Sequence, residues 1–414
     1  MPQPWHRNGL APDDCATPRP FRRLPPNETR LTLPAHASPA SPRPLVISIN
    51  AAWNIVNFRL GLIAALQRRG FSVTALAPPD EHVDRLAAAG IPYVPIAMDK
   101  KGLSPAADLL LLARYWRLLR RLRPAAYLGY TAKPNVYGSI AAHLLGIPVI
   151  NNVAGLGTAF IRPGPLAALL LWLYKRAFGR SATVFFQNPE DMTLFLERGI
   201  VKAKQAVLLP GSGIDLSRYT PRAPVPGSAE QGFTFLLVGR LIRDKGVGEF
   251  VEAARLVRAR HPGARFQLLG FLDVENRTAV SRADVERWAA EGLIEYLGEA
   301  EDVRPHLAAA DCIVLPSYRE GMPRVLLEGA AMARPLIATD VPGCRTLVRD
   351  GENGLLCAVR DSGSLAGAML RMIAMPAAAR GALGATGRRI VEQEYDEGIV
   401  VERYLEAVTA AIGA

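Results

Sequence analysis

The sequence predicts an α/β protein made of two doubly wound domains, each with a parallel sheet, facing a central cleft. Short apolar runs rich in Val and Ile alternate with longer segments of helical spacing, which is the pattern of βαβ units. The alternation stops once, between residues 216 and 232, and then resumes. With 414 residues, half of them hydrophobic and 21% charged, the chain is long enough for two such domains. The same composition excludes a disulfide miniprotein and a wholly disordered chain.

The N-terminal segment differs in composition from the rest of the chain. Residues 1–43 hold ten of the 33 prolines and no sustained periodic run. Such a segment buries too little apolar surface to fold, so we expect a disordered tail.

The first folded domain is expected to span residues 44–215. Apolar runs predict strands at 45–49, 73–77, 148–152 and 183–187. A helix is expected at 58–69, because Arg68, Arg69 and Gly70 provide cations followed by the glycine that commonly ends a helix.

A linker and a second domain follow. Residues 216–232 contain three prolines and no apolar run, which is typical of a linker. Further strands are expected at 233–239, 265–270, 311–315 and 335–338, within a domain spanning 233–390. Residues 391–414 are expected to form a C-terminal helix that can pack back on the first domain. Two domains of this kind bind ligands between the carboxyl ends of their strands.

A loop after the 311–315 strand carries the most informative chemistry. Residues 317–323, SYREGMP, lead into a helix beginning near Pro323, a residue that suits the first helical position. Unpaired N–H groups at such a terminus bind phosphate, so we assign phosphate binding to the segment Gly321, Met322 and Pro323, in which Pro323 has no N–H of its own and serves to start the helix. Glu320 lies in the loop and Glu328 in the second turn of the helix. The Glu328 carboxylate can accept two hydrogen bonds from a sugar diol.

Cations suited to the same phosphates follow the 233–239 strand. Arg240 and Lys245 can neutralise a diphosphate, the first through a planar fork and the second as a point charge. Gly239 and Gly246 leave room for a ligand to approach the backbone. Two glutamates eight residues apart are more often a solvated helix face, so the assignment depends on the two motifs together.

From Pro44 to the C-terminus the chain resembles glycosyltransferase family 4, the retaining, metal-independent nucleotide-sugar enzymes of GT-B fold. The likeness is carried by GR followed by DKG at 239–246 and by EGMPRVLLE at 320–328. The segments 130–160, 186–191 (FQNPED) and 210–219 (PGSGIDLSRY) resemble the branch that extends lipid-linked oligosaccharides and capsular polysaccharides, in particular its N-acetylgalactosaminyltransferases acting on undecaprenyl diphosphates.

The resemblance implies roles for these residues. Arg240 and Lys245 would hold the diphosphate of a donor, a UDP-sugar, while Glu328 would hold its ribose hydroxyls. Glu320 would hold the transferred sugar near the reacting carbon, so Glu320, Lys245 and Arg240 are the catalytic candidates. The acceptor would be a saccharide on a polyprenyl diphosphate. No Asp-x-Asp pair occurs in the chain, so we expect neither a metal nor another cofactor.

The chain departs from the family in its first domain. Many relatives have a His before the glycine that follows the 148–152 strand, whereas this chain has Ala154. That role is therefore not carried over. Lys133, Asn151 and Asn152 are polar candidates for contact with the sugar or with the acceptor phosphate, although Lys133 also suits a surface cation and the asparagines a turn cap. Asn54 is a further candidate, in a loop that lacks the family's Gly-Gly pair.

The net charge of +11 is concentrated in one region of the chain. No Asp or Glu occurs between Leu109 and Pro189, where ten Lys and Arg residues lie. In the helix expected at 109–123, four arginines share one side and apolar residues the other. We expect this region to contact an anionic membrane or the acceptor phosphate.

The predicted location is the cytoplasm, peripheral on the inner face of the cytoplasmic membrane. The four cysteines form neither a disulfide framework nor a CxxC pair, and the N-terminus has no apolar leader. Two other functions fit part of the pattern. A UDP-N-acetyl-sugar 2-epimerase uses the same kind of cleft, and a nucleic-acid-binding protein agrees with the pI near 9.7. The chain has no nucleic-acid-binding motif, so no nucleic-acid partner is expected.

Overall fold

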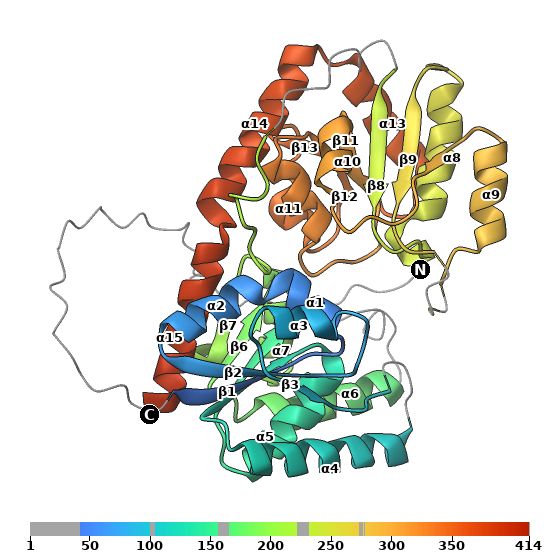
Figure 1. Ribbon diagram of the computed structural model, residues 1–414. Coiled ribbons are helices and arrows are strands. Elements are labelled where there is room, and N and C mark those ends of the chain that lie inside the picture. The colour runs from blue at the N-terminus through green and yellow to red at the C-terminus, as the bar shows by residue number, and fades with distance from the viewer. Residues whose placement is uncertain are drawn as a thin grey trace, which may run out of the picture. The chain divides into compact units, whose positions relative to one another are not determined.

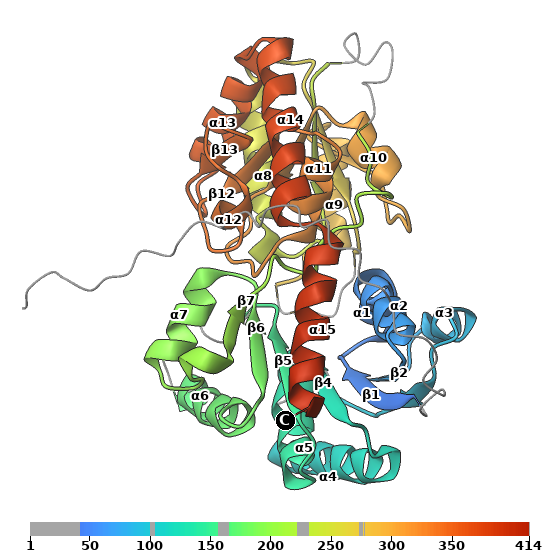
Figure 2. The ribbon, with the colours of Figure 1, turned by 90° about the vertical axis from the view of Figure 1, so that its left-hand side faces the viewer.

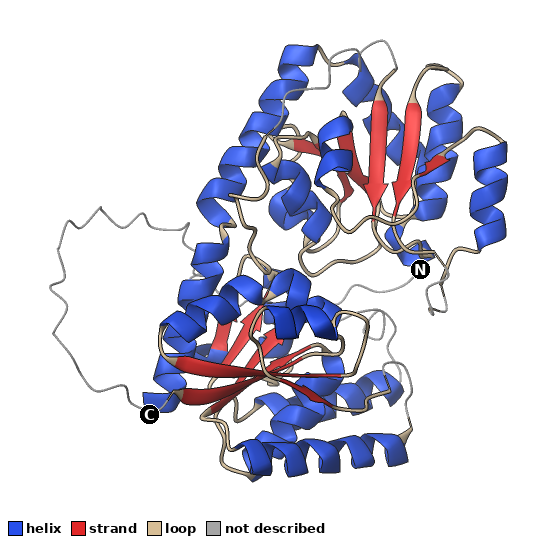
Figure 3. Cartoon of the chain, viewed as in Figure 1, coloured by secondary structure: helices blue, strands red, loops and turns tan. Residues whose placement is uncertain are grey.

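The computed structural model describes residues 42–99, 104–155, 165–221, 232–272, 276 and 278–413. Residues Pro42–Ala414 make up one compact unit, which contains two parallel β-sheets with helices on their faces (Figure 1). The fold class predicted from the sequence is confirmed, and Figure 3 shows the helical layers around each sheet. Residues 1–41 and 222–231, which hold all but the last two residues of the predicted tail and most of the predicted linker, lie outside the described residues. The predicted tail ends slightly too late, because Arg43 already begins a strand.

The first sheet has seven strands in the order β3-β2-β1-β4-β5-β6-β7, all paired in parallel. The strands are β1 (Arg43–Ser48), β2 (Phe71–Ala77), β3 (Tyr93–Pro95), β4 (Ala126–Tyr130), β5 (Val149–Val153), β6 (Thr183–Phe186) and β7 (Ala206–Leu208). The helices are α1 (Ala52–Phe58), α2 (Leu60–Arg68), α3 (Val83–Ala88), α4 (Pro105–Leu122), α5 (Ser139–Leu144), α6 (Pro165–Phe178) and α7 (Pro189–Glu197), with a π-helical turn η1 (Pro134–Gly138) and a 3₁₀ turn η3 (Ala203–Gln205).

The helix expected at 58–69 is confirmed as α2, which begins two residues later and ends at the predicted cations. The sequence did not predict α1, which precedes it and is separated from it at Arg59. The guanidinium of Arg59 is buried and lies 4.4 Å from the centre of the Tyr130 ring. This tertiary contact draws Arg59 into the domain, and neither Gly nor Pro marks the break in the sequence.

The second sheet has six strands in the order β10-β9-β8-β11-β12-β13. The strands are β8 (Thr234–Val238), β9 (Arg265–Leu269), β10 (Glu295–Tyr296), β11 (Cys312–Leu315), β12 (Leu336–Thr339) and β13 (Gly354–Cys357). The helices are α8 (Val247–Arg258), α9 (Arg282–Ala290), α10 (Arg304–Ala309), α11 (Arg324–Ala331), α12 (Cys344–Leu347), α13 (Ser362–Ala374), α14 (Ala377–Glu394) and α15 (Glu397–Gly413), with a 3₁₀ turn η5 (Arg243–Lys245).

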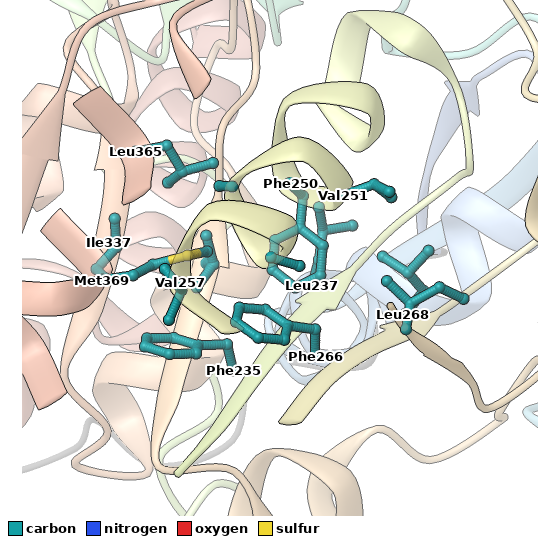
Figure 4. Packing of buried hydrophobic residues seen from close by; sticks show 14 of the residues in the cluster. Phe235, Leu237, Phe250, Val251, Val257, Phe266, Leu268, Ile337, Leu365 and Met369 are labelled. Atoms are coloured by element: carbon teal, nitrogen blue, oxygen red, sulfur yellow. The ribbon is translucent and has the colours of Figure 1, made fainter. Parts of the chain in front are cut away.

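The core of the second domain forms where α8 and α13 cover the sheet. Phe235 and Phe266 on neighbouring strands stack with ring centres 5.4 Å apart, and Phe250 of α8 meets Phe266 edge-on (Figure 4). All three rings are fully buried, and the removal of their apolar surface from water stabilises the packing of helix against sheet. This packing fixes β8 in the sheet, and the site is built from the carboxyl end of that strand.

The C-terminal segment returns to the first domain. A long helix had been expected at 391–414, but α14 ends at Glu394 and α15 begins at Glu397. Between them, Ile214 pairs with Asp396 through a parallel bridge. Beyond this point Val400, Tyr404 and Val408 of α15 belong to the buried core of the first domain (Figure 2).

Candidate functional site

The site lies at the carboxyl ends of β8 and β11, which are neighbours in the second sheet. The chain runs from β8 outward to β9 and β10, and later to β11 and β12 on the other side. Strand order therefore reverses between β8 and β11. Such a switch point leaves a crevice between the two following loops, where ligands bind in open α/β sheets.

Lys245 and Glu320 meet at this crevice. Lys245 ends the turn η5 after β8, and Glu320 lies in the loop after β11. The Lys245 ammonium donates a hydrogen bond to Oε1 of Glu320 at 2.5 Å, and 22% and 13% of these side chains are exposed. An ammonium has three N–H donors, so Lys245 can hold Glu320 and still donate to a ligand oxygen.

Gly246 allows the two loops to approach each other. Its φ of +73° lies in the left-handed region, which favours glycine. A Cβ atom at this position would lie 2.1 Å from the carbonyl oxygen of Pro316, which directly follows β11. The glycine of the DKG motif therefore brings Lys245 close to the loop that carries Glu320.

Glu328 is buried in α11 and already has protein partners. Its Oε1 accepts hydrogen bonds from the Tyr219 hydroxyl at 2.9 Å and from Nε of Arg324 at 3.0 Å. Arg324 also donates to the carbonyl oxygen of Gly213 at 3.0 Å. Burial and the nearby carboxylate raise the pKa of Tyr219, so its hydroxyl stays a donor at neutral pH. The carboxylate predicted to hold ribose is thus fixed in orientation through one oxygen.

The residues predicted to bind phosphate at the start of α11 lie against the first domain. Pro323 has extended backbone and caps the helix, which begins at Arg324. Met322 packs over Gly211, where an added Cβ would lie 2.6 Å from Cγ of Met322. A Cβ on Gly321 would lie 1.8 Å from the carbonyl oxygen of Ala154, the residue that stands where relatives have a His.

Arg240 is exposed at the end of β8. Within the described part of the chain its guanidinium makes no ion pair with a carboxylate. It follows Gly239 directly, on the same loop as Lys245.

Asn151 and Asn152 lie inside the first domain rather than on its open side. Asn151 donates to Asn135 at 3.0 Å and to Ser139 at 2.8 Å, and accepts from Ser181 at 2.6 Å. The side chain of Asn152 donates to Tyr404 at 2.9 Å and accepts from Gln187 at 3.2 Å. Both asparagines have 0% exposure, so in this arrangement their side chains support the sheet and the packing of α15.

Lys133 and Asn54 also have protein partners. The Lys133 ammonium lies 2.7 Å from Oδ1 of Asp108, at the start of α4, and only 16% of the Lys133 side chain is exposed. Asn54 donates to the side chain of Asn50 at 3.0 Å. Among the contacts of the described residues, none joins Asn54, Lys133, Asn151 or Asn152 to Lys245 or Glu320.

Sequence reasoning missed a polar contact between the two domains. Arg319 donates to the buried carboxylate of Asp191, and Nδ2 of Asn188 donates to the carbonyl oxygen of Gly321 at 3.3 Å. One signal was present in the sequence. Asn188 followed by Pro189 and two acids is a helix start, and Asn188 caps α7 by accepting from the Asp191 amide at 2.8 Å.

Neither a metal cluster nor a membrane span is found in the described ranges. No three His, Cys, Asp or Glu side chains of these ranges gather where they could hold a metal ion. Among the same residues, no helix has the length and apolar character needed to cross a bilayer.

Family comparisons match both domains. The family "Glycosyl transferase 4-like domain" matches residues 55–211, and "Glycosyl transferases group 1" matches residues 232–375. Together they span more than two thirds of the chain.

Two curated proteins illustrate the similarity. The N,N'-diacetylbacillosaminyl-diphospho-undecaprenol alpha-1,3-N-acetylgalactosaminyltransferase of Campylobacter jejuni is 27% identical over 380 residues, 86% of this chain and 96% of that protein. The UDP-Gal:alpha-D-GlcNAc-diphosphoundecaprenol alpha-1,3-galactosyltransferase of Escherichia coli is 25% identical over 283 residues, 66% of this chain and 72% of that protein.

Solved structures show the same fold. Anabaena HepE, in complex with UDP and glucose, superimposes with a TM-score of 0.71 at 18% identity, over 88% of this chain and 99% of that one. WaaG, a glycosyltransferase involved in lipopolysaccharide biosynthesis, gives a TM-score of 0.66 at 15% identity, over 88% and 99% of the two chains. The fold is GT-B, as the resemblance implied. The chain is a glycosyltransferase of the family 4 type, with a glycosyl transferase 4-like domain followed by a group 1 domain.

Proposed function

We propose that this glycosyltransferase moves a sugar from a UDP-sugar to a saccharide carried on a polyprenyl diphosphate, with retention of anomeric configuration and without a metal ion. The observation that carries the proposal is the meeting of Lys245 and Glu320 at the switch point between β8 and β11. The names of the two curated relatives, which act on diphospho-undecaprenol saccharides, support the acceptor class. The UDP bound to the structural neighbour HepE is consistent with the donor class.

The proposed reaction balances without a further reactant. The bond between C1 of the donor sugar and the β-phosphate oxygen breaks, and its electron pair leaves with UDP. An acceptor hydroxyl oxygen forms the new bond to C1 on the same face, and its proton passes to the departing phosphate oxygen. Negative charge therefore grows on the diphosphate as the reaction proceeds.

The cations at the crevice suit that change in charge. Lys245 and the exposed Arg240 follow the same strand, and both can donate to the diphosphate oxygens. Groups that are already aimed at the leaving oxygens stabilise the transition state more than the ground state. This gives the fold a way to activate the leaving group with side chains alone.

The two glutamates would hold the rest of the donor. Glu320 lies beside Lys245, so its carboxylate is placed to accept hydrogen bonds from hydroxyls of the transferred sugar. Glu328 lies eight residues further along, and Tyr219 and Arg324 both donate to its Oε1, so its second oxygen would accept hydrogen bonds from a ribose diol. We assign the sugar to Glu320 and the nucleoside to Glu328.

The proposal is tested with purified protein, a panel of UDP- and GDP-sugars and synthetic polyprenyl-diphosphate saccharides. We expect a product whose mass increases by one sugar with a UDP donor, unchanged yield in EDTA, and an α-linkage by NMR when the donor is α-linked. Loss of activity in EDTA that Mg²⁺ or Mn²⁺ restores would contradict the metal-independent part. Conversion of a UDP-N-acetyl sugar to its 2-epimer without acceptor would favour the epimerase alternative. Salt-dependent binding to DNA without sugar transfer would favour the nucleic-acid-binding alternative.

We further propose that the enzyme binds the cytoplasmic face of an anionic membrane through the first domain. The helices α4, α5 and α6 lie together on one side of its sheet (Figures 1 and 2). Exposed apolar side chains on these helices include Leu109 and Leu144, each 68% exposed, and Trp172, 54% exposed. Exposed cations accompany them on α4 and α6, namely Arg117, Arg120, Arg121, Lys175 and Arg176.

Each Lys or Arg near an anionic leaflet contributes about 1 kcal/mol to the free energy of membrane binding, so several of them are enough for peripheral attachment. Vesicles with anionic lipid should sediment the protein at low salt and release it at high salt. The double variant Arg117→Glu with Arg121→Glu should bind these vesicles more weakly than wild type. The control, Arg371→Glu with Arg389→Glu on the second domain, changes the net charge by the same amount and should bind them as wild type does. Equal binding of both variants, or no binding at low salt, contradicts the membrane proposal.

A further inference from the structure

The loop that carries Glu320 is attached alternately to the two domains. Tyr318 donates through its amide to the carbonyl oxygen of Asp244, and Glu320 accepts from Lys245, both in the second domain. Arg319 contacts Asp191, and Gly321 accepts from Asn188, both in the first domain. The residues on either side of Glu320 are thus held by the first domain, while Glu320 itself faces the second.

Asp191 is a buried carboxylate committed to this contact. Its side chain is 1% exposed, and burial of an unpaired carboxylate is strongly unfavourable. Oδ1 accepts from the Arg319 guanidinium, and Oδ2 accepts from Nδ2 of Asn188 at 3.0 Å. Asp191 also lies in the first turn of α7, where the helix dipole favours negative charge. These partners fix the carboxylate in one orientation toward the loop.

The contact leaves little room for the loop to shift. Asn188 is fully buried, and the same Nδ2 that bonds Asp191 reaches Gly321. Gly321 lies so close to Ala154 that a Cβ would overlap the Ala154 carbonyl oxygen. Separation of the domains would therefore release Arg319 and Gly321 at once, leaving Glu320 with Lys245 alone.

We propose that Asp191 and Asn188 are positioning residues that set the Glu320 carboxylate for sugar transfer by holding its two neighbours from the opposite domain. The inference rests on the sugar-holding role given to Glu320 in the proposed function. Catalysis then depends on contact between the domains, whereas diphosphate binding by Lys245 and Arg240 belongs to the second domain. The two steps should respond differently to substitution at Asp191.

The test uses Asp191→Asn and Asn188→Ala in the full-length protein, with Glu190→Gln as a matched control. Glu190 is the exposed neighbour of Asp191, and its substitution removes the same charge without touching Arg319. Asp191→Asn should lower kcat at least tenfold and leave the Kd for UDP, which lacks the sugar assigned to Glu320, within twofold. Arg319→Lys, which keeps a cation, should retain more activity than Arg319→Gln. The double variant Asp191→Asn with Arg319→Gln should lower kcat no more than either single substitution does.

A second readout is independent of activity. Hydrogen–deuterium exchange of the amides in residues 317–323, measured without substrate, should be faster in Asp191→Asn than in wild type and unchanged in Glu190→Gln. Wild-type exchange in Asp191→Asn overturns the positioning role, as does a wild-type kcat or an equal loss of kcat and UDP affinity. Failure of the wild-type enzyme to transfer from any UDP-sugar contradicts the proposed function instead, and the exchange measurement still decides whether the loop is held.

Discussion

The Tyr219 hydroxyl donates a hydrogen bond of 2.9 Å to Oε1 of Glu328, although 109 residues separate them in the sequence. Tyr219 lies at the start of the segment that joins the domains, and Glu328 lies on α11. The contact connects the joining segment to the carboxylate assigned to the donor ribose. Neither the spacing of the glutamates nor the composition of the segment indicates such a contact.

Removal of this hydroxyl should weaken donor binding. A hydrogen bond to a charged group contributes about 1.5–3 kcal/mol, and 1.4 kcal/mol corresponds to about tenfold in affinity. Tyr219→Phe should therefore raise the Kd for UDP about tenfold or more, measured by calorimetry. Tyr93→Phe removes a hydroxyl that donates to the Ala77 carbonyl within the first domain, so it should leave the Kd unchanged. Equal UDP affinity in wild type and Tyr219→Phe contradicts the role given to Glu328.

Gly246→Ala should disturb both stability and activity. The left-handed backbone costs a residue with a Cβ roughly 1–2 kcal/mol, and the overlap with the Pro316 carbonyl adds a further cost. Urea unfolding should show a loss of about 2–4 kcal/mol, together with lower kcat because Lys245 moves. Gly248→Ala is the control, since its added Cβ meets nothing within 4 Å and lies in α8. An undiminished free energy of unfolding in Gly246→Ala would show that the loop accommodates a side chain.

Glu397 should make stability depend on pH. Burial, followed by the nearby Asp215 carboxylate, raises the pKa of Glu397 in the folded protein. A carboxyl with a raised folded pKa favours the folded state when protonated, so this stabilisation decreases as pH rises through the unfolded and then the folded pKa. The gain in the free energy of unfolding from Glu397→Gln should be larger at pH 7.5 than at pH 4. A gain that is the same at both pH values contradicts the raised pKa.

Strands and helix starts could be predicted from the sequence where a local residue pattern determines them. Apolar runs predicted strands such as β1 and β8, whereas β4 and β13 were not predicted. The strands β3, β7 and β10 were also not predicted, because two or three residues are too few to show a period. Ser104 and Pro105 begin α4, and Asn188 and Pro189 begin α7, through caps that are readable in the sequence. The break at Arg59 depends on a tertiary contact with Tyr130, so local signals do not contain it.

The candidate site was predictable only in part for the same reason. Motif spacing brought Lys245 and Glu320 together correctly, because both follow strands that are adjacent in a doubly wound sheet. Asn151 and Asn152 were predicted from proximity to the loop, but they lie within the β5 strand, where their side chains pair with buried partners. Arg319 and Asp191 are 128 residues apart, and only the folded chain brings them into contact.

The turnover of Lys245→Ala with a UDP-sugar and a polyprenyl-diphosphate saccharide tests the donor-site assignment most directly. Lys204→Ala is the matched control, because Lys204 is an exposed lysine of the turn η3 in the first domain. We expect Lys245→Ala to fold with a wild-type circular dichroism spectrum but to have a kcat about a hundredfold lower, which corresponds to a loss of about 2.7 kcal/mol of transition-state stabilisation. Full activity of folded Lys245→Ala would contradict the assignment of the donor diphosphate to this site.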